Sequence, residues 1–204
     1  MSLRDWSLLI ALSILWGGSF FFVRVALDGV PPLTLVLARV AIAAAVLLML
    51  LRATGESLPR RRAVWLTLAV MALLNNVIPF SLIFWGQTAI PAGLAAILNA
   101  TTPLFTVIVM HLFTDDDRAT PGKAVGVTLG FAGVVVLVGP AATGTLDTPL
   151  WALAACLAAA LSYAVSGLWS RRIKPLGLTP TFTAFAQLSV TSLVMTPVVA
   201  LVDR

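Results

Sequence analysis

Long apolar stretches separated by short polar loops run along the whole chain. Each stretch holds roughly 20 residues with few charges, which is the length of helix that crosses a hydrocarbon core about 30 Å thick. The stretches are continuous and do not alternate, so they favour helices over the strands of a β-barrel. The sequence predicts seven transmembrane helices, near residues 6–26, 33–52, 63–86, 91–113, 121–140, 149–170 and 180–202.

Composition agrees with a membrane protein. Hydrophobic residues make up 60% of the 204 residues and charged residues only 10%, whereas soluble domains are about 25% charged. The first apolar stretch is longer than the core of a secretory signal and has no cleavage pattern, so we expect it to remain as a span. The predicted fold class is an all-α polytopic membrane protein.

Basic residues set the predicted orientation, because loops rich in Lys and Arg stay in the cytoplasm. A cytoplasmic N-terminus leaves only Arg24, Arg39 and Arg204 outside the cytoplasmic segments. The other ten of the thirteen basic residues are Arg4, Arg52, Arg60, Arg61, Arg62, Arg118, Lys123, Arg171, Arg172 and Lys174. The net charge of +5 follows from this topology and does not indicate nucleic-acid binding.

The stretch "ILWGGSFFFVR" places small and polar residues in the middle of the first predicted span. Trp16 is followed there by Gly17, Gly18 and Ser19, whereas the other five tryptophans fall at span ends, where amphipathic rings favour the headgroup level. Small residues allow a second helix or a solute to approach closely. This motif alone leaves two interpretations, tight helix packing and a cavity wall.

Amide side chains near the centres of the third and fourth spans indicate a polar cavity. Asn75 and Asn76 precede Pro79, and Asn99 precedes Pro103. Hydrocarbon offers amides no partner, and each proline predicts a bend and frees a backbone carbonyl about one turn earlier. A central cavity is the favoured interpretation, and hydrogen bonding between helices alone is the alternative.

Other spans add candidate solute contacts. Tyr163 and Gln187 lie at mid-depth in the sixth and seventh spans, and Arg39 lies about two turns into the second span. Arg39 either extends its head group outward to the interface or lines the outer part of the cavity and binds an anionic group such as a carboxylate. Both interpretations remain open.

Groups for proton coupling or catalysis are scarce. All eight acidic residues fall at the termini or in loops, and the only histidine, His111, suits the inner interface better than a proton relay. The single cysteine, Cys156, excludes an internal disulfide. The sequence lacks HExxH, GxSxG and the phosphate-binding GxxxxGK[ST]. We therefore predict no enzyme activity, no catalytic residues, no metal and no cofactor, and we favour facilitated exchange over proton coupling.

Two long segments resemble a known transporter family. "ILWGGSFFFVRVALDGVPPLTLVLARVAIAA" resembles the opening of the EamA-type transporters of the drug/metabolite transporter superfamily. "AGLAAILNATTPLFTVIVMHLF", followed by "DRATPGKAVGVTLGFAGVVVL", resembles the fourth and fifth helices of the same repeat, so that the resemblance covers residues 6–140. Asp117 stands where the family usually has glutamate, and Asn99 stands where small or hydroxyl residues are commoner.

The resemblance implies ten helices in two five-helix repeats of inverted topology around a central cavity. Residues 1–140 would form the first repeat and residues 141–204 the first two helices of the second, so we expect three helices to be lacking. Members of this family export amino acids, including aromatic ones, or other small metabolites. Trp16 and Tyr163 lie in corresponding helices of the two repeats, which suits stacking on an aromatic solute.

The predicted function is transport of small metabolites, amino acids above all, across a bacterial inner membrane by alternating access around a midplane cavity. The expected partners are a small solute, the lipid bilayer and, further, a second copy of the chain. Multidrug transport, nucleotide-sugar transport, a passive channel and a non-transporting helical scaffold remain as alternatives. The candidate residues are Trp16, Ser19, Arg39, Asn75, Asn76, Asn99, Tyr163 and Gln187 for solute binding, Pro79 and Pro103 for bending, and Gly17, Gly18, Gly126, Gly130 and Gly133 for helix packing.

Overall fold

The computed structural model describes residues 2–56, 58–59, 61–142 and 148–203. Arg60 and Arg204, which entered the predicted charge distribution, lie outside the described residues. Within the described part, seven helical spans are long and apolar enough to cross a membrane, which confirms the number expected from hydropathy. Five of them are continuous helices: α1 (Leu3–Ala26), α2 (Pro32–Ala53), α7 (Pro121–Ala142), α8 (Leu150–Ser170) and α9 (Pro180–Val202).

Local sequence signals explain where several of these helices begin. Ser2 and Asp5 form a capping box at the start of α1, in which the Asp5 N–H donates to Ser2 Oγ (3.2 Å) and the Ser2 N–H donates to Asp5 Oδ2 (2.7 Å). Thr179 Oγ1 accepts from the Phe182 N–H (3.1 Å) and so caps α9. Pro32, like Pro121 and Pro180, is the first residue of its helix, where a missing N–H costs little.

The third span is irregular in its middle. It consists of α3 (Arg62–Ala72), a π-helical segment, η1 (Leu73–Val77), and α4 (Ile78–Gln87). The Ile78 N–H donates to the Leu73 carbonyl, five residues back. If the next residue continued this pattern, its N–H would donate to the Leu74 carbonyl, but the next residue is Pro79, which has no N–H. Ser162 Oγ of α8 donates to that carbonyl instead (2.7 Å), so a neighbouring helix satisfies the group that Pro79 leaves free.

The fourth span is divided into α5 (Ala92–Asn99) and α6 (Thr102–Phe113). Thr101 Oγ1 donates to the Leu98 carbonyl (2.6 Å), and Thr102 Oγ1 donates to the Asn99 carbonyl (2.7 Å). These hydroxyls satisfy carbonyls at the end of α5, directly before Pro103. The break therefore falls within the "NATTP" stretch, beside the amide of Asn99.

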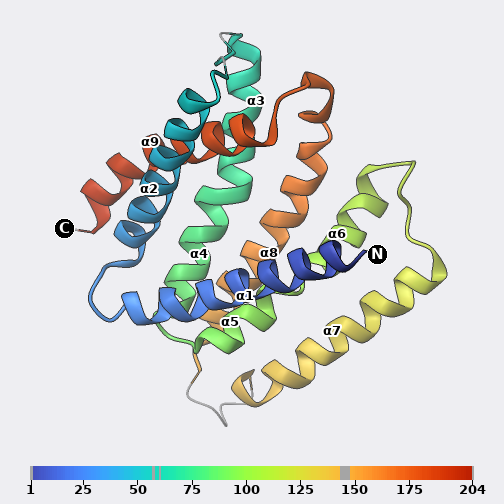
Figure 1. The fold of residues 1–204 in the computed structure, drawn as a ribbon. Helices are drawn as coiled ribbons and strands as arrows, with labels where there is room; N and C mark the ends of the chain where they lie inside the picture. The colour runs from blue at the N-terminus through green and yellow to red at the C-terminus, as the bar shows by residue number, and fades with distance from the viewer. Residues whose placement is uncertain (1, 57, 60, 143–147, 204) are drawn as a thin grey trace.

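Helix α8 is the most buried span, and α7 is the least buried. In Figure 1, α2 lies beside α9 on one side of the bundle, α4 and α6 pack on α8, and α1 crosses over α4 and α5. Helix α7 lies at the edge, next to α6. The main core forms where α4 meets α8 and includes Ile83, Phe84, Ala152, Cys156 and Ala159.

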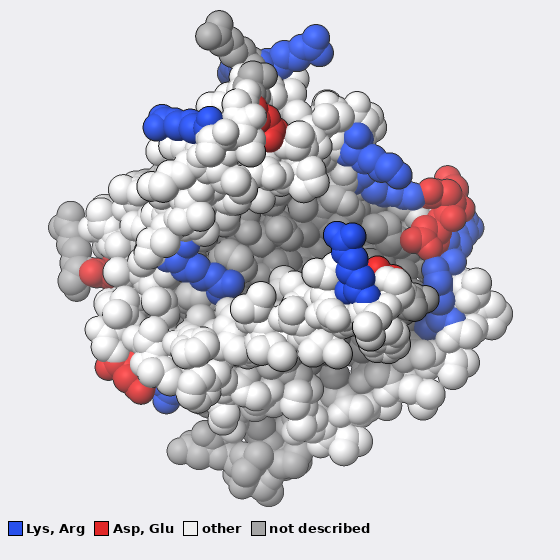
Figure 2. Space-filling view, viewed as in Figure 1, with Lys and Arg blue, Asp and Glu red and all other residues white. Residues whose placement is uncertain are grey.

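Polar contacts tie the loops together at both ends of the bundle. At one end the loop before α7 meets the loop after α8, where Arg171 pairs with both carboxylate oxygens of Asp116. At the other end Asp203 Oδ2, just past α9, accepts from the Thr34 N–H (2.7 Å) and Oγ1 (2.9 Å) near the start of α2. Figure 2 shows most charged side chains toward the margins of one face, while blue side chains also lie within the broad, mostly uncharged surface between them.

Candidate functional site

A cavity lies among α1, α2, α4, α5 and α8, together with η1 and α6, and it consists of two chambers that share five lining residues, called outer and inner after the predicted orientation. The outer chamber, of about 210 Å³, is lined among others by Ser19, Arg39, Phe84 and Gln87. The inner chamber, of about 460 Å³, is lined among others by Asn75, Asn76 and Thr102. Both chambers share the lining residues Trp16, Arg39, Phe80, Asn99 and Tyr163.

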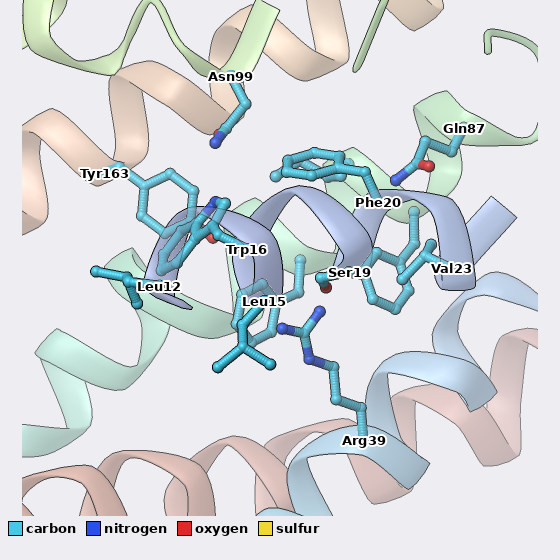
Figure 3. A pocket seen from close by; sticks show the side chains of 13 residues that line it. Leu12, Leu15, Trp16, Ser19, Phe20, Val23, Arg39, Gln87, Asn99 and Tyr163 are labelled. Atoms are coloured by element: carbon cyan, nitrogen blue, oxygen red, sulfur yellow. The ribbon is translucent and has the colours of Figure 1, made fainter. Parts of the chain in front are cut away.

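Seven of the eight residues predicted to bind solute line this cavity. Figure 3 shows Arg39, Tyr163 and Asn99 reaching toward α1 from α2, α8 and α5. The structure thus brings together side chains that are far apart in sequence. The seven are Trp16, Ser19, Arg39, Asn75, Asn76, Asn99 and Tyr163.

Gln187, the eighth candidate, is buried on α9 and is not among the residues that line the two chambers. Its Oε1 accepts a hydrogen bond from Asn75 Nδ2 (3.4 Å), and Asn75 Oδ1 accepts one from Ser166 Oγ (3.1 Å). Asn75 is therefore held by two other helices, whereas its neighbour Asn76 has an unpaired Nδ2 among the described residues. Asn75 thus combines both interpretations drawn from the sequence, because it bonds two other helices and also lines the inner chamber.

Arg39 is the only charged residue in the cavity wall as the structure describes it. Its Cζ lies 4.9 Å from the ring centroid of Phe80 and 5.9 Å from that of Phe84. No carboxylate among the described residues pairs with it. Ring faces stabilise a cation only modestly, by about 0.5–2 kcal/mol, so the guanidinium keeps its capacity to bind an anion bidentately.

Buried amides give the cavity wall further unused hydrogen-bonding capacity. Asn76 is 5% exposed, Asn99 8% and Gln87 0%. Asn76 Nδ2, Asn99 Oδ1 and both amide atoms of Gln87 have no hydrogen-bond partner among the described residues. A buried polar group left unpaired costs about 1–3 kcal/mol, so these positions suit binding of a polar ligand better than they suit stability.

The sequence interpretation missed Gln87, Phe80 and Thr102. Gln87 follows the predicted end of the third span by one residue and reads as part of a polar loop, but the helix continues through it. A signal was present nonetheless: Phe80, Phe84 and Gln87 are spaced four and three residues apart, so they share one face of α4. That face is the cavity wall.

Glycines predicted to mediate packing have different surroundings. A Cβ on Gly130 would lie 2.6 Å from Leu104 Cδ1, so this residue allows α7 to approach α6. Around Gly17, Gly126 and Gly133 no described atom beyond the chain neighbours and the helix's own backbone comes within 4 Å of that position, and Gly18 meets only Phe22 of its own helix. A packing role for these four stays a prediction.

Charged and titratable residues singled out by sequence lie away from the cavity. His111 Nδ1 accepts a hydrogen bond from the Ala119 N–H (3.3 Å) in the loop before α7. Asp117, in the same loop, pairs with Lys123 (2.8 Å). Both residues therefore shape a loop and do not line the chambers.

Comparison with known proteins gives a consistent picture. The EamA-like transporter family matches residues 6–139. The chain is 31% identical over 175 residues to the uncharacterized inner membrane transporter YedA of Escherichia coli (strain K12), covering 83% of this chain and 54% of that protein. It is 28% identical over 177 residues to a probable terminal-alkyne amino-acid exporter of Streptantibioticus cattleyicolor, covering 86% and 56%. It is also 27% identical over 175 residues to a probable amino-acid metabolite efflux pump of Escherichia coli (strain K12), covering 85% and 55%.

The chain spans about half the length of the curated relatives it matches. No solved structure matches it.

Proposed function

Since this chain belongs to the EamA-like transporter family, we propose that it carries small metabolites bearing a carboxylate, amino acids above all, across the bacterial inner membrane. Transport proceeds by alternating access around the cavity of α1, α2, α4, α5 and α8. Two relatives are named as exporters of amino acids or their metabolites, which supports this substrate class. The name of a third, an inner membrane transporter, supports the location.

The observation that carries the proposal is Arg39, a cation inside the cavity with no carboxylate partner among the described residues. Two opposite charges 4 Å apart attract by about 4 kcal/mol at an effective dielectric constant of 20. A solute carboxylate is therefore well matched to this position. Phe80, Trp16 and Tyr163 offer ring faces to the apolar part of the solute.

The wall also disfavours cationic solutes. None of the described lining residues is Asp, Glu or His. The ammonium group of an amino acid would lie against neutral oxygens, such as Asn99 Oδ1, and against ring faces. An amine that lacks the carboxylate would be repelled by Arg39, with no attraction between opposite charges to offset this. The protein therefore transports carboxylates and does not transport simple amines. The same absence favours exchange without a proton-binding group in the cavity.

Replacing Arg39 with glutamine tests this proposal. In proteoliposomes, wild-type protein is expected to give saturable counterflow of L-phenylalanine, which phenylethylamine does not inhibit. Arg39→Gln keeps polarity but removes the charge, so we expect KM for phenylalanine to rise at least tenfold, which corresponds to about 1.4 kcal/mol.

Arg24→Gln is the matched control. Arg24 also lies in a span, but it pairs with Asp28 (2.9 Å) and does not line the cavity. We expect this variant to transport as the wild type does. Equal losses in both variants, equal inhibition by the amine, or flux that does not saturate would contradict the proposal.

A further inference from the structure

Gln87 is an unusual residue for the end of a transmembrane helix, because its amide is fully buried and unpaired. The side chain is 0% exposed, and neither Nε2 nor Oε1 has a hydrogen-bond partner among the described residues. It nevertheless lines the outer chamber, and Figure 3 shows its amide directed toward Phe20 of α1. An amide can donate and accept at once, so this one lacks both kinds of partner.

The packing of α4 explains why Gln87 cannot turn away from the chamber. Gly86 brings α4 so close to α8 that a Cβ on it would lie 3.0 Å from Cys156 Sγ and 3.1 Å from the Ala152 carbonyl oxygen. This contact fixes the rotation of the last turn of α4. Phe80, Phe84 and Gln87 then share the face that lines the chamber.

The same face places Gln87 close to the cation of the cavity. The guanidinium of Arg39 lies over the rings of Phe80 and Phe84, and Gln87 comes three residues after Phe84. Three residues advance a helix by about 4.5 Å along its axis. Phe80, the nearer of the two rings, precedes Gln87 by seven residues, so Arg39 and Gln87 bound one chamber from positions between about one and two helical turns apart.

A structural role does not account for these features. A leucine would fill similar space without leaving two polar atoms unpaired, and unpaired buried groups are costly. Residues that reduce stability in this manner are typical of functional sites. By contrast, Gln187 on α9 has the partner expected of a structural amide, Asn75.

We propose that Gln87 binds the solute directly and recognises an amino or hydroxyl group next to the carboxylate that Arg39 binds. This inference rests on the proposed function and narrows its substrate class to amino acids and hydroxy acids, with plain monocarboxylates excluded. The chamber has a volume of about 210 Å³, which suits a small solute or its polar head group. Specificity follows because a solute without the second polar group forgoes the hydrogen bonds of Gln87.

Three ligands with one carbon skeleton test the inference: L-phenylalanine, 3-phenyllactate and 3-phenylpropanoate. Binding to the purified protein is measured by isothermal titration calorimetry. We expect the wild type to bind phenylalanine and phenyllactate at least tenfold more tightly than phenylpropanoate. Gln87→Leu removes both hydrogen-bonding groups, so we expect the three affinities to become equal at the level of phenylpropanoate.

Thermal unfolding supplies a second readout that separates binding from structure. Gln87→Leu removes unpaired groups, so its Tm is expected to rise. Gln187→Leu is the matched control for this measurement: it leaves Asn75 Nδ2 without a partner, and its Tm is expected to fall. A fall in Tm for Gln87→Leu would show that the amide is paired and would overturn the inference.

The ligand series also distinguishes failure of this inference from failure of the proposed function. Equal affinities of the wild type for all three ligands would overturn the role of Gln87 and leave carboxylate transport standing. Absence of binding by all three would overturn both. If Gln87→Leu does not fold, the wild-type series and Gln87→Met decide the question in the same manner.

Discussion

A single residue without a side chain sets the distance between α4 and α8. At Gly86 a Cβ would lie 3.0 Å from Cys156 Sγ and 3.1 Å from the Ala152 carbonyl oxygen, closer than side chains normally approach. The second of these atoms belongs to the backbone and cannot move aside alone. Because Gln87 comes next, this contact also controls the wall of the outer chamber.

We expect Gly86→Ala to lower the free energy of unfolding by about 1–3 kcal/mol, the usual cost of overpacking. Thermal unfolding in detergent measures the effect. Gly133→Ala, in α7, is the control, since no described atom beyond its chain neighbours and its own helix backbone lies within 4 Å of the added methyl group. Alanine improves helix propensity by up to about 1 kcal/mol, so the control is expected to be neutral or stabilising. A Gly86→Ala protein as stable as the control would refute the close contact.

At the scale of elements, a hydrogen bond links the π-helical segment η1 of the third span to α8. Pro79 provides no N–H, and Ser162 Oγ donates to the Leu74 carbonyl (2.7 Å) in its place. The irregular segment is therefore stabilised by another helix, since its own backbone leaves one carbonyl unpaired.

A double-mutant cycle tests this arrangement. Ser162→Ala leaves the Leu74 carbonyl unpaired, and we expect a loss of about 1–3 kcal/mol in the free energy of unfolding. In a Pro79→Ala background the chain regains an N–H, so the same change is expected to cost less, with a coupling energy of at least about 0.5 kcal/mol.

Ser170→Ala is the control for that cycle, because Ser170 Oγ donates to the Gly167 carbonyl of its own helix (2.6 Å). Its effect is expected to stay within about 0.5 kcal/mol in both backgrounds. Equal costs of Ser162→Ala with and without Pro79 would argue against the link between the two residues.

Hydropathy predicted the spans because it depends on neighbouring residues, but the partners of the polar groups are distant in sequence. Asn75 is bonded to Ser166 and Gln187, which follow it by 91 and 112 residues. Periodicity cannot identify such pairs, so the sequence predicts Gln187 in the cavity, although it does not line the described chambers. Gln87 was missed for the opposite reason, since its polarity suggested a loop. The proline at position 79 predicted a bend, but it could not predict a π-helical segment.

At the scale of the whole molecule, an ion pair links the loops of the two predicted repeats. Arg171, after α8, contacts both carboxylate oxygens of Asp116, before α7. The hydrogen bond from Arg171 holds the pKa of the Asp116 carboxyl below its usual value, and the same bond raises the pKa of Arg171. The link is therefore present above the ordinary pKa of an aspartate, about 4, and is lost as the pH falls through the lowered value.

Pulsed EPR distances between spin labels in these two loops test the link. At pH 7 we expect Asp116→Asn to broaden the distance distribution, because a neutral amide binds the guanidinium less strongly than a carboxylate does. Acidification of the wild type through the lowered pKa of Asp116 is expected to give the same broadening, while Asp116→Asn no longer responds to pH.

Asp115→Asn is the control at pH 7. Asp115 pairs with Arg118 of the same loop (2.6 Å), so its loss is expected to leave the distance between the loops unchanged. Similar broadening in both variants would show that loop charge in general, and not the pair with Arg171, determines the distance.

The wide turn at η1 also takes up one residue without rotating the two halves of the third span against each other. Each residue of an α-helix advances it by about 100°, but a π-type turn contains one residue more than an α-turn. Loss of one residue from Leu73–Val77 would therefore turn the wide turn into an α-turn and keep the register of α4 relative to α3. Val64 and Leu68 would keep their contacts near α9, and Gln87 would stay at the outer chamber, while the Asn75–Asn76 stretch of the inner chamber would change. A lineage can thus reshape the inner chamber by a one-residue deletion and leave the outer chamber as it is.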